Sequence, residues 1–390
     1  MTPAARVAAA IEILDGIIAA ARNRGAPADR LITEWFRTRR FAGSGDRRAV
    51  REMVYTAIRA CGEIPASGRA AMVLLARRDP ALAALFDGSR HAPEPIAPDE
   101  PAASAGVAPG WLAAALAASG LDAGEQAALL DRAPLDIRIN ALKAALADLP
   151  EPGEPCPAPQ GRRYPAGTPV ETWPAYETGA IEVQDAGSQL VCAVVGARAG
   201  ETVIDLCAGG GGKSLALAAA MDNRGTIIAS DADRARLAKL GPRAARAGAT
   251  IIETRLLDTG REAAALAAWA GKADAVLVDA PCSGTGTWRR NPEARWRLTN
   301  AELTRLTALQ ARLLDVAAGL VRPGGRLVHV VCSLLDAEGA DQVAGFLARS
   351  PGWRADPPVL PAGRAHGAGL LLTPGHDGTD GFFVARLERL

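Results

Sequence analysis

Short apolar strands alternate with helical segments through the second half of the chain, and this pattern constrains the fold more than any other feature of the sequence. The alternation begins near Gly179 and continues to the last residues. Strands alternating with helices form a mostly parallel sheet, so the sequence predicts a doubly wound α/β fold with ligands outside the carboxyl ends of the strands. Strands are expected at Thr202–Leu206, Thr226–Asp231, Ala249–Thr254, Ala273–Asp279 and Gly325–Val331, with a last, antiparallel strand at or near the sheet edge at Gly381–Leu387.

The first part of the chain is mainly helical. Val7, Ile11, Leu14 and Ile18 form one apolar stripe at helical spacing. Similar patterns recur through residues 31–37, 46–59, 70–86 and 110–131. We therefore expect a helical domain over residues 1–130, interrupted by a proline-rich linker at 91–109 that no helix tolerates.

A small α/β connector is expected between the two larger domains, over residues 131–178. It contains a short strand at Asp136–Asn140 that leads into a helix, followed by a second proline-rich stretch. The α/β domain with the alternating pattern then occupies residues 179–390.

Composition and cysteine usage exclude several classes of protein. Hydrophobic residues make up 49% of the chain and charged residues 22%, which is ordinary globular usage. No uncharged apolar run reaches the roughly 18–20 residues of a membrane span, and Glu12 and Asp15 interrupt the stretch that a signal peptide would need. Six scattered cysteines without a C-x-x-C pair indicate neither a zinc site nor a disulfide framework. We expect a cytoplasmic protein without bound metal or membrane contact, and nothing demands more than a monomer.

Positive charge is concentrated at the start of the chain although the whole chain carries a net charge of only +1. Residues 1–90 contain 15 Arg against 9 Asp and Glu, a local net charge of 15 − 9 = +6. Guanidinium groups suit phosphate, which favours a nucleic-acid partner. A solvated helix surface explains the same charge and stays open.

A glycine loop and an acidic residue predict a nucleoside cofactor. Four glycines, Gly209 to Gly212, lie between a strand and a helix, where backbone N–H groups approach a ligand closely. Asp231 ends the next strand 20 residues after Gly211, the position from which a carboxylate binds ribose hydroxyls. Asp258, after the third strand, could contact the adenine, and a solvated loop residue explains it equally well.

The sequence around the glycine loop favours S-adenosylmethionine over NAD. A phosphate-binding P-loop is excluded because it would need glycine where Cys207 stands. Asp205 precedes the loop, and a carboxylate there would repel a pyrophosphate but attract a cationic methionine moiety.

Two neighbouring strands each deliver a cysteine to the same edge of the sheet. The fourth strand ends in Asp279-Ala-Pro-Cys-Ser-Gly-Thr-Gly286, and the fifth ends in His329-Val-Val-Cys-Ser333. Either cysteine alone could be a buried packing residue. Cys282 and Cys332 together, beside a carboxylate and a nucleoside site, are harder to explain as packing.

Four motifs in this order resemble those of the Nop/Sun RNA cytosine-5 methyltransferases, and the RsmB branch of that family fits best. They are Val183-Gln-Asp-Ala-Gly-Ser-Gln189, Asp205-Leu-Cys-Ala-Gly-Gly-Gly-Gly-Lys213, Asp279-Ala-Pro-Cys-Ser-Gly-Thr-Gly286 and Val331-Cys-Ser333. The resemblance covers residue 179 to the end, and residues 1–90 more loosely resemble the NusB-like RNA-binding domain of that branch. It implies a Rossmann-like class I methyltransferase sheet behind an all-helical domain.

The resemblance also implies a reaction and a set of site residues. Methyl transfer from S-adenosylmethionine to carbon 5 of an RNA cytosine would proceed through addition of Cys332 to carbon 6. Cys282 would assist product release, and Asp279 would contact ring nitrogen 3 of the cytosine. The cofactor-binding residues expected are Asp205, Cys207, Ala208, Gly209, Gly210, Gly211, Gly212, Lys213, Asp231, Asp258 and Asp279.

Two positions depart from the family pattern. The family usually has proline where Gly210 stands, and threonine where Val331 precedes the nucleophile. The first change loosens the loop and should weaken cofactor binding, and the second removes a hydroxyl. Neither removes a group that the reaction strictly needs.

The substrate is the least constrained part of the prediction. Ribosomal RNA of the 16S type is expected from the N-terminal resemblance, and RNA contacts are expected from Arg289, Arg290 and Arg295, which lie near Trp288 and Trp296. Packing of both tryptophans in the core is the alternative. Transfer RNA, a DNA cytosine-5 methyltransferase with Cys282 as nucleophile, and a non-catalytic RNA-binding assembly factor stay open.

Overall fold

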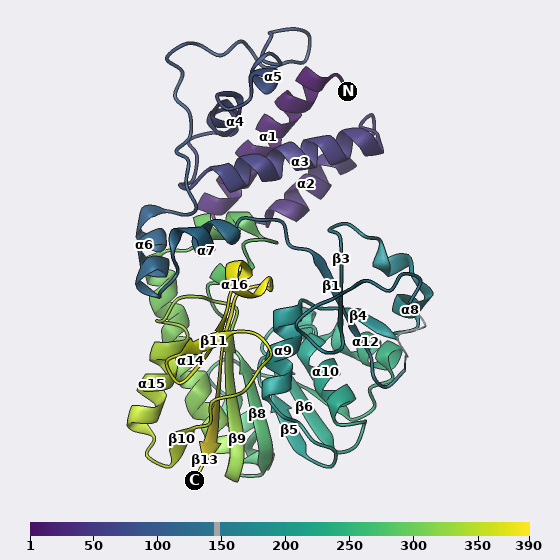
Figure 1. Ribbon diagram of the computed structural model, residues 1–390, viewed down its shortest axis with the longest axis vertical. Coiled ribbons are helices and arrows are strands. Elements are labelled where there is room, and N and C mark those ends of the chain that lie inside the picture. Colours follow the sequence, from purple (N-terminus) through teal and green to yellow (C-terminus); the bar gives the residue numbers. More distant parts are fainter. Residues whose placement is uncertain (144–148) are drawn as a thin grey trace. The chain divides into compact units, whose positions relative to one another are not determined.

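The computed structural model describes residues 1–143 and 149–390 and divides the chain into two compact units (Figure 1). The first unit contains Met1–Asp131 together with Thr287–Thr299, and the second contains Arg132–Gly286 together with Asn300–Leu390. The short segment Thr287–Thr299 thus belongs to the first unit although it lies deep in the sequence of the second. The finer division of the second unit into a connector and an α/β domain stays a prediction.

The first unit is built from helices around an apolar core. Thr2 caps the first helix by accepting a hydrogen bond from the Ala5 backbone N–H, and Val7, Leu14 and Ile18 line its buried face as the sequence pattern indicates. The helices are α1 (Pro3–Arg22), α2 (Ala28–Arg37), α3 (Ser44–Ala60), α4 (Gly68–Ala76), α5 (Pro80–Ala83), α6 (Gly110–Ala118) and α7 (Ala123–Ala128), with the 3-10 helix η5 (Pro292–Trp296).

Two of the helices expected in this unit are shorter than the sequence pattern suggested. The helix expected over 70–86 is split into α4 and α5, because Asp79 caps a new helix that begins at Pro80. Proline lacks the N–H that would continue α4 but suits the first turn of α5. The pattern at 110–131 is likewise divided between α6 and α7.

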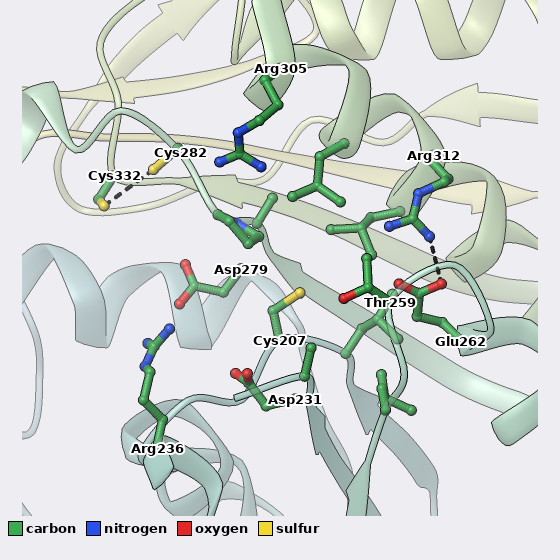
Figure 2. A pocket seen from close by; sticks show the side chains of 17 residues that line it. Cys207, Asp231, Arg236, Thr259, Glu262, Asp279, Cys282, Arg305, Arg312 and Cys332 are labelled. Atoms are coloured by element: carbon green, nitrogen blue, oxygen red, sulfur yellow. Dashed lines mark hydrogen bonds and ion pairs between the residues drawn. The ribbon is translucent and has the colours of Figure 1, made fainter. Parts of the chain in front are cut away.

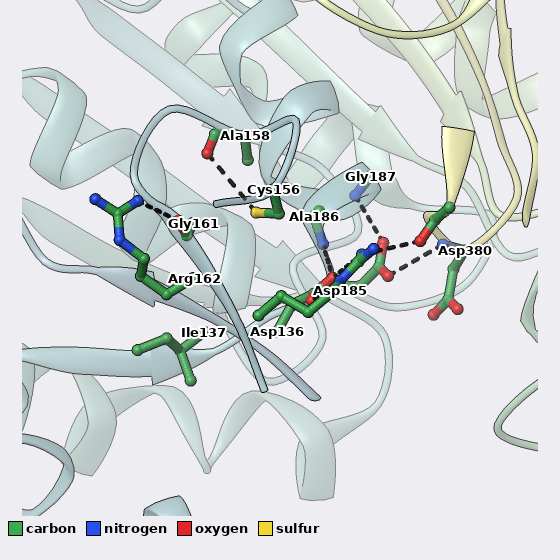
Figure 3. Close-up of polar contacts among 12 residues, drawn as sticks. Asp136, Ile137, Cys156, Ala158, Gly161, Arg162, Asp185, Ala186, Gly187 and Asp380 are labelled. Atoms are coloured by element: carbon green, nitrogen blue, oxygen red, sulfur yellow. Dashed lines mark hydrogen bonds and ion pairs between the residues drawn. The ribbon is translucent and has the colours of Figure 1, made fainter. Parts of the chain in front are cut away.

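A four-stranded antiparallel sheet opens the second unit. Its strand order is β2-β3-β1-β4, and Asp136 at its centre accepts two hydrogen bonds from Arg163, of 2.7 and 2.9 Å, and one from the Ala186 N–H. Figure 3 shows how Asp185 begins the next helix by accepting from the Gly187 N–H, and how it accepts from the Asp380 N–H. The elements are β1 (Leu135–Ile139), β2 (Glu154–Pro155), β3 (Gly161–Tyr164), η2 (Val170–Thr172), α8 (Pro174–Glu177) and β4 (Ile181–Val183). The helix expected directly after β1 falls largely outside the described residues.

The large sheet of the second unit has nine strands and is parallel through its centre. Its order is β11-β12-β13-β9-β8-β5-β6-β7, with β10 paired to β13. The strands are β5 (Thr202–Asp205), β6 (Thr226–Asp231), β7 (Ile252–Leu256), β8 (Ala273–Asp279), β9 (Val321–Val331), β10 (Trp353–Ala355), β11 (Arg364–His366), β12 (Gly369–Leu372) and β13 (Phe382–Arg389).

The predicted α/β fold is confirmed, with local differences. Strand β7 begins three residues later than expected, and β13 is antiparallel to β9 with the short strands β12 and β11 beyond it. The single helix expected over 233–247 is divided into α11 and α12. The helices are α9 (Ala186–Val194), α10 (Gly212–Ala220), α11 (Arg234–Leu237), α12 (Leu240–Ala247), α13 (Glu262–Ala265), η3 (Ala267–Trp269), η4 (Thr285–Thr287), α14 (Asn300–Leu320), α15 (Ala340–Arg349) and α16 (Pro374–Asp377).

The order of the parallel strands creates a switch point in the sheet. The chain runs outward from β5 through β6 to β7, then returns to the other side of β5 to form β8 and β9. The carboxyl ends of β5, β6, β8 and β9 therefore meet at one edge, and the connections leave β5 and β8 in opposite directions. Ligands of open α/β sheets bind at such a point.

Among the helices that the structure describes, none combines the length and the apolar character required to cross a membrane.

Candidate functional site

A cavity of about 500 Å³ lies at the switch point of the large sheet (Figure 2). The loops after β5, β6 and β8 line one part of it, with Cys207, Asp231 and Asp279 facing the space. Cys282 and Cys332 close one end, and α14 contributes Arg305 and Arg312. The cavity thus gathers side chains that lie far apart in the sequence.

The glycine loop between β5 and α10 needs glycine at two positions. Gly209 and Gly211 have φ angles of 55° and 83°, which few residues with a Cβ atom adopt. A Cβ atom on Gly211 would lie 2.0 Å from Cδ1 of Leu240. The Gly209 N–H donates to Oδ2 of Asp231 at 2.7 Å, so the loop is tied to the end of the neighbouring strand. Gly210, one of the two departures from the family pattern, has no such φ constraint.

Asp205 is a buried carboxylate with one oxygen unused. Its Oδ2 accepts a hydrogen bond from the Ser214 hydroxyl at 2.6 Å, and its Oδ1 has no partner among the described residues. Burial raises the pKa of Asp205 to about 7, with nearby Asp279 acting in the same direction. A buried acceptor without a partner is costly, and a cationic ligand would relieve that cost. The free acceptor oxygen of Asp205 fits the amino group of a methionine moiety, which would donate to it.

Lys213 and Asp279 form an ion pair across the cavity edge, with Nζ 2.6 Å from Oδ2. Burial opposes the charge on Lys213, but the Asp279 carboxylate raises the pKa of the ammonium above its usual value. The ammonium also lies 5.8 Å from the ring centre of Phe382. Lys213 therefore stays protonated and holds the Asp279 carboxylate in one orientation.

The two strand-end cysteines are neighbours in space. The Sγ atoms of Cys282 and Cys332 are 3.4 Å apart, and both side chains are partly exposed. The contact with Cys332, followed by burial, raises the pKa of the Cys282 thiol well above its usual value. Cys282 therefore retains its proton and can donate it in a hydrogen bond to the sulfur of Cys332.

A buried hydrogen-bond network joins the loops that carry the two cysteines. The Glu338 carboxylate accepts from the Ser283 N–H at 2.9 Å, from the Ser283 hydroxyl, and from the Gln310 amide at 3.0 Å. The Ser283 hydroxyl also contacts that of Ser333 at 3.1 Å. Gly286 N–H donates to the Cys332 carbonyl at 3.0 Å. The network fixes the spacing of the cysteines, and sequence reasoning missed Glu338 and Gln310.

The His329 side chain takes part in the same network rather than facing the cavity. It is fully buried, and its Nε2 lies 3.0 Å from the Glu338 carbonyl oxygen. Burial lowers its pKa, so the imidazole is a neutral structural group. The sequence analysis assigned it no role.

The structure brings together five of the residues singled out from the sequence. Cys207, Asp231, Asp279, Cys282 and Cys332 all line the cavity. Asp205, the four glycines and Lys213 lie at the end of β5, in the loop and in the first turn of α10, and do not line the cavity. Gly209 and Lys213 contact the lining residues Asp231 and Asp279. Asp258 is exposed and does not line the cavity, although its neighbours Leu257 and Thr259 do.

The arginines expected to contact RNA lie in the segment that belongs to the first unit. Arg295 is fully buried and donates to the carbonyl oxygens of Ile58 at 2.6 Å and Cys61 at 2.8 Å. Burial lowers its pKa to about 10. A phosphate cannot reach a guanidinium enclosed in this way, so the expectation of an RNA contact from Arg295 is corrected to a structural role. Arg289 is buried too, and Arg290 is partly exposed.

The alternative interpretation of the tryptophans in this segment is confirmed. Trp288 and Trp296 are both buried, and Trp296 belongs to the core of the helical unit.

Fold and site together define a Rossmann-like α/β protein of the methyltransferase type. The model of the family described as 16S rRNA methyltransferase RsmB/F matches residues 193–388, about half of the chain. The chain belongs to this family, as its motif order implies.

Relatives and solved structures agree with that assignment. A protein of Synechocystis sp. named probable ribosomal RNA small subunit methyltransferase B is 36% identical over 65% of this chain and 60% of its own length. A methyltransferase homologue from Pyrococcus horikoshii has 26% identity and a TM-score of 0.60, over 68% of this chain and 90% of that chain. NSun6 from Pyrococcus horikoshii, solved with the S-adenosylmethionine analogue SFG, has 25% identity and a TM-score of 0.52, over 59% and 58% of the two chains. The match to the Synechocystis relative thus leaves about 40% of that relative uncovered.

Proposed function

We propose that this chain transfers a methyl group from S-adenosylmethionine to carbon 5 of a cytosine in RNA, with 16S-type ribosomal RNA as the substrate. The observation that carries the proposal is the cysteine pair, whose sulfurs lie 3.4 Å apart at the rim of a cavity that also contains Asp231 and Asp279. The names of the relatives support ribosomal RNA as the substrate class.

The residues of the glycine loop and the neighbouring strand ends would hold the cofactor. Asp205 would bind the amino group of the cofactor and Asp231 its ribose hydroxyls. Backbone groups of the glycine loop would approach the remaining part of the cofactor. S-adenosylmethionine supplies an electrophilic methyl group on a sulfonium when it is bound. No described group of three or more His, Cys, Asp or Glu could hold a metal ion, and the proposal requires none.

Cys332 is the proposed nucleophile. Carbon 5 of cytosine is a weak nucleophile. The Cys332 thiolate therefore first forms a bond to carbon 6, which moves electron density to carbon 5. Carbon 5 then takes the methyl group. The bonding pair of the transferred methyl group stays on the cofactor's sulfur. Water then takes the proton from carbon 5, the electron pair of that C–H bond re-forms the double bond between carbons 5 and 6, and the carbon–sulfur bond breaks so that Cys332 leaves as the thiolate.

Cys282 and Asp279 assist this sequence without bonding to the base. The Cys282 thiol keeps its proton and donates a hydrogen bond to the departing sulfur. Asp279, oriented by Lys213 at 2.6 Å, would accept a hydrogen bond from ring nitrogen 3 when that nitrogen is protonated in the adduct, and so keep the base in place. A target inside a duplex must be extruded before it reaches these groups.

Single serine variants test the assignment of the two cysteines. Cys332→Ser should lose both methyl transfer and the covalent RNA adduct, whereas Cys282→Ser should accumulate the adduct on a denaturing gel. Cys156→Ser is the matched control, because Cys156 lies outside the cavity lining. An adduct lost in Cys282→Ser and kept in Cys332→Ser would instead support the mechanism of a DNA-type cytosine-5 methyltransferase.

Bisulfite sequencing of total RNA identifies the substrate. RNA from cells that lack the gene is compared with RNA from cells complemented with the wild type or with Cys332→Ser. One cytosine protected only by the wild-type protein would identify the substrate and the nucleophile together. No changed cytosine would contradict the RNA methyltransferase proposal.

A further inference from the structure

A second cavity lies within the helical unit and has no role in the proposed chemistry. Its volume is about 680 Å³, in the range of ligand sites. Small side chains of α1, among them Ala5, Ala8 and Ala9, form one wall. Trp35 at the end of α2 and Phe41 after it form another, and the loop residues Arg90 and His91 also line the space. The three alanines leave room between the aromatic and the basic residues.

The aromatic wall of this cavity is exposed to an unusual degree. Phe41 is 71% exposed, and it is the one aromatic among the large exposed hydrophobic side chains that the structure describes. The Arg39 guanidinium lies 4.2 Å from the ring centre of Trp35 and is held there by Glu12. An exposed aromatic beside a cation and a second ring is the arrangement on which nucleobases stack.

Of the two arginines that line the cavity, Arg39 is paired with Glu12, whereas the positive charge of Arg90 is not neutralised within the unit. Within residues 1–143 and 149–390, the guanidinium groups of Arg40 and Arg90 have no hydrogen-bond or ion-pair partner, and both residues are exposed. They belong to the stretch 1–90, whose net charge is +6 from 15 Arg and 9 acidic residues. The unpaired Arg90 guanidinium lines the same cavity as Trp35 and Phe41, so one cavity offers a phosphate partner beside surfaces for an unpaired base.

We infer that this cavity binds an unpaired nucleotide of the RNA substrate, with its base against Phe41 and Trp35 and its phosphate at Arg90. The inference rests on the proposed function, because it names where that RNA meets the helical unit. An apolar peptide would use Phe41 equally well but would leave Arg90 without a partner. Charge complementarity therefore favours RNA over a peptide.

Measuring the affinity for RNA tests the binding site in the helical unit independently of methyl transfer. The probe is an in vitro transcript of 16S-type ribosomal RNA, bound to the full-length protein and measured by filter binding at several salt concentrations. Phe41→Ala should weaken binding on the order of 5- to 150-fold, the range for loss of one stacked base. Arg90→Glu should weaken it and reduce the slope of log affinity against log salt by about 0.7 for the lost phosphate contact.

Two matched variants control for fold and charge. Val359→Ala removes an exposed side chain of the second unit, and Val359 is 96% exposed. Arg78→Glu makes the same charge change as Arg90→Glu on an exposed residue of the first unit that does not line the cavity. Both should bind RNA like the wild type within about twofold. Equal losses in Arg78→Glu and Arg90→Glu would mean general attraction only and would overturn the site.

Crosslinking localises the contact. Transcripts containing 4-thiouridine should crosslink on ultraviolet irradiation to the tryptic peptide Phe41–Arg47. Crosslinks confined to other peptides, or unchanged affinity in Phe41→Ala, would overturn the inference, as would a wild-type protein that binds no RNA. A protein that binds RNA through Phe41 but transfers no methyl group would refute the proposed function and leave this site standing.

Discussion

The two ends of the active-site cavity are held in place by different means. At the cofactor end, the conformation is set by the backbone: two glycines with positive φ angles and one hydrogen bond from Gly209 N–H to Asp231. At the cysteine end, Ser283 in the loop after β8 and Gln310 of α14 both donate to the Glu338 carboxylate in the loop after β9. The cofactor end is therefore set mainly by the backbone conformation of one loop, whereas the cysteine end depends on side-chain contacts between residues 28 and 55 positions apart in the sequence.

Among the residues that hold the two cysteines in place, Glu338 should have the largest effect on catalysis when its carboxylate is removed. Glu338→Ala leaves the Ser283 N–H without its acceptor and removes one of the two acceptors of the Gln310 amide, which keeps the Pro281 carbonyl; Glu338 and Gln310 are both fully buried. We expect kcat to fall on the order of 100-fold, since displacements of about 1 Å at reacting groups cost that much. The cofactor dissociation constant, measured by calorimetry, should change less than about threefold.

The conservative variant separates positioning from folding. Glu338→Gln keeps the size of the side chain and one acceptor oxygen, so it should recover much of the lost kcat at an unchanged melting temperature. If Glu338→Ala weakens cofactor binding as strongly as it lowers kcat, the two ends of the cavity are not held independently and the comparison fails.

Gly211→Ala should produce the opposite pattern at the cofactor end. The φ angle of 83° is strained for alanine, and the new Cβ atom would lie 2.0 Å from Leu240 Cδ1. We expect the cofactor to bind about 10- to 100-fold more weakly, the equivalent of about 1–3 kcal/mol of such strain. Gly210→Ala is the comparison, because its Cβ atom would meet only the flexible end of Arg243 at 3.3 Å. Equal losses of cofactor affinity in Gly211→Ala and Gly210→Ala would contradict the conclusion that the positive φ angle of Gly211 is required for cofactor binding.

Cofactor affinity should also depend on pH through Asp205. Its pKa is raised from 3.8 to about 7, so the ionised fraction rises about tenfold between pH 6 and pH 8. Binding of a cationic ligand should strengthen by about the same factor in titration calorimetry. Asp205→Asn should bind the cofactor weakly, with an affinity that does not change with pH. A wild-type affinity that stays constant between pH 6 and pH 8 would show that Asp205 does not bind the cofactor.

The raised pKa of Asp205 also makes the stability of the folded protein depend on pH. Between pH 3.8 and about 7 the folded protein keeps a proton that the unfolded chain has released. This group's contribution to stability therefore falls as the pH rises through that window. Asp205→Asn, which carries no charge in either state, should be more stable than the wild type at pH 8 without cofactor.

Sequence patterns predicted the parallel strands, the glycine loop and the cavity position of both cysteines because each depends on neighbours along the chain. Strand β8 and the positions of Asp279 and Cys282 follow from one apolar run and the loop after it. The convergence of Glu338, Gln310 and Ser283 could not be predicted, since only packing of α14 and the post-β9 loop brings these side chains together. The RNA contact predicted for Arg295 was wrong for the same reason, because packing and not sequence pattern decides where the side chain lies. An arginine between aromatic residues is typical of an RNA-binding surface, but Arg295 is buried in a core.

Arg295 should matter for stability and not for RNA electrostatics. Its guanidinium donates to the backbone carbonyls of Ile58 and Cys61, and Arg295→Met would remove this charged donor from both buried groups. We expect the helical unit to lose about 1–3 kcal/mol of stability, seen as a lower melting temperature. The slope of log RNA affinity against log salt should stay at the wild-type value, because a buried guanidinium releases no counterion from phosphate. A reduced slope at unchanged stability would restore Arg295 to the RNA-binding surface.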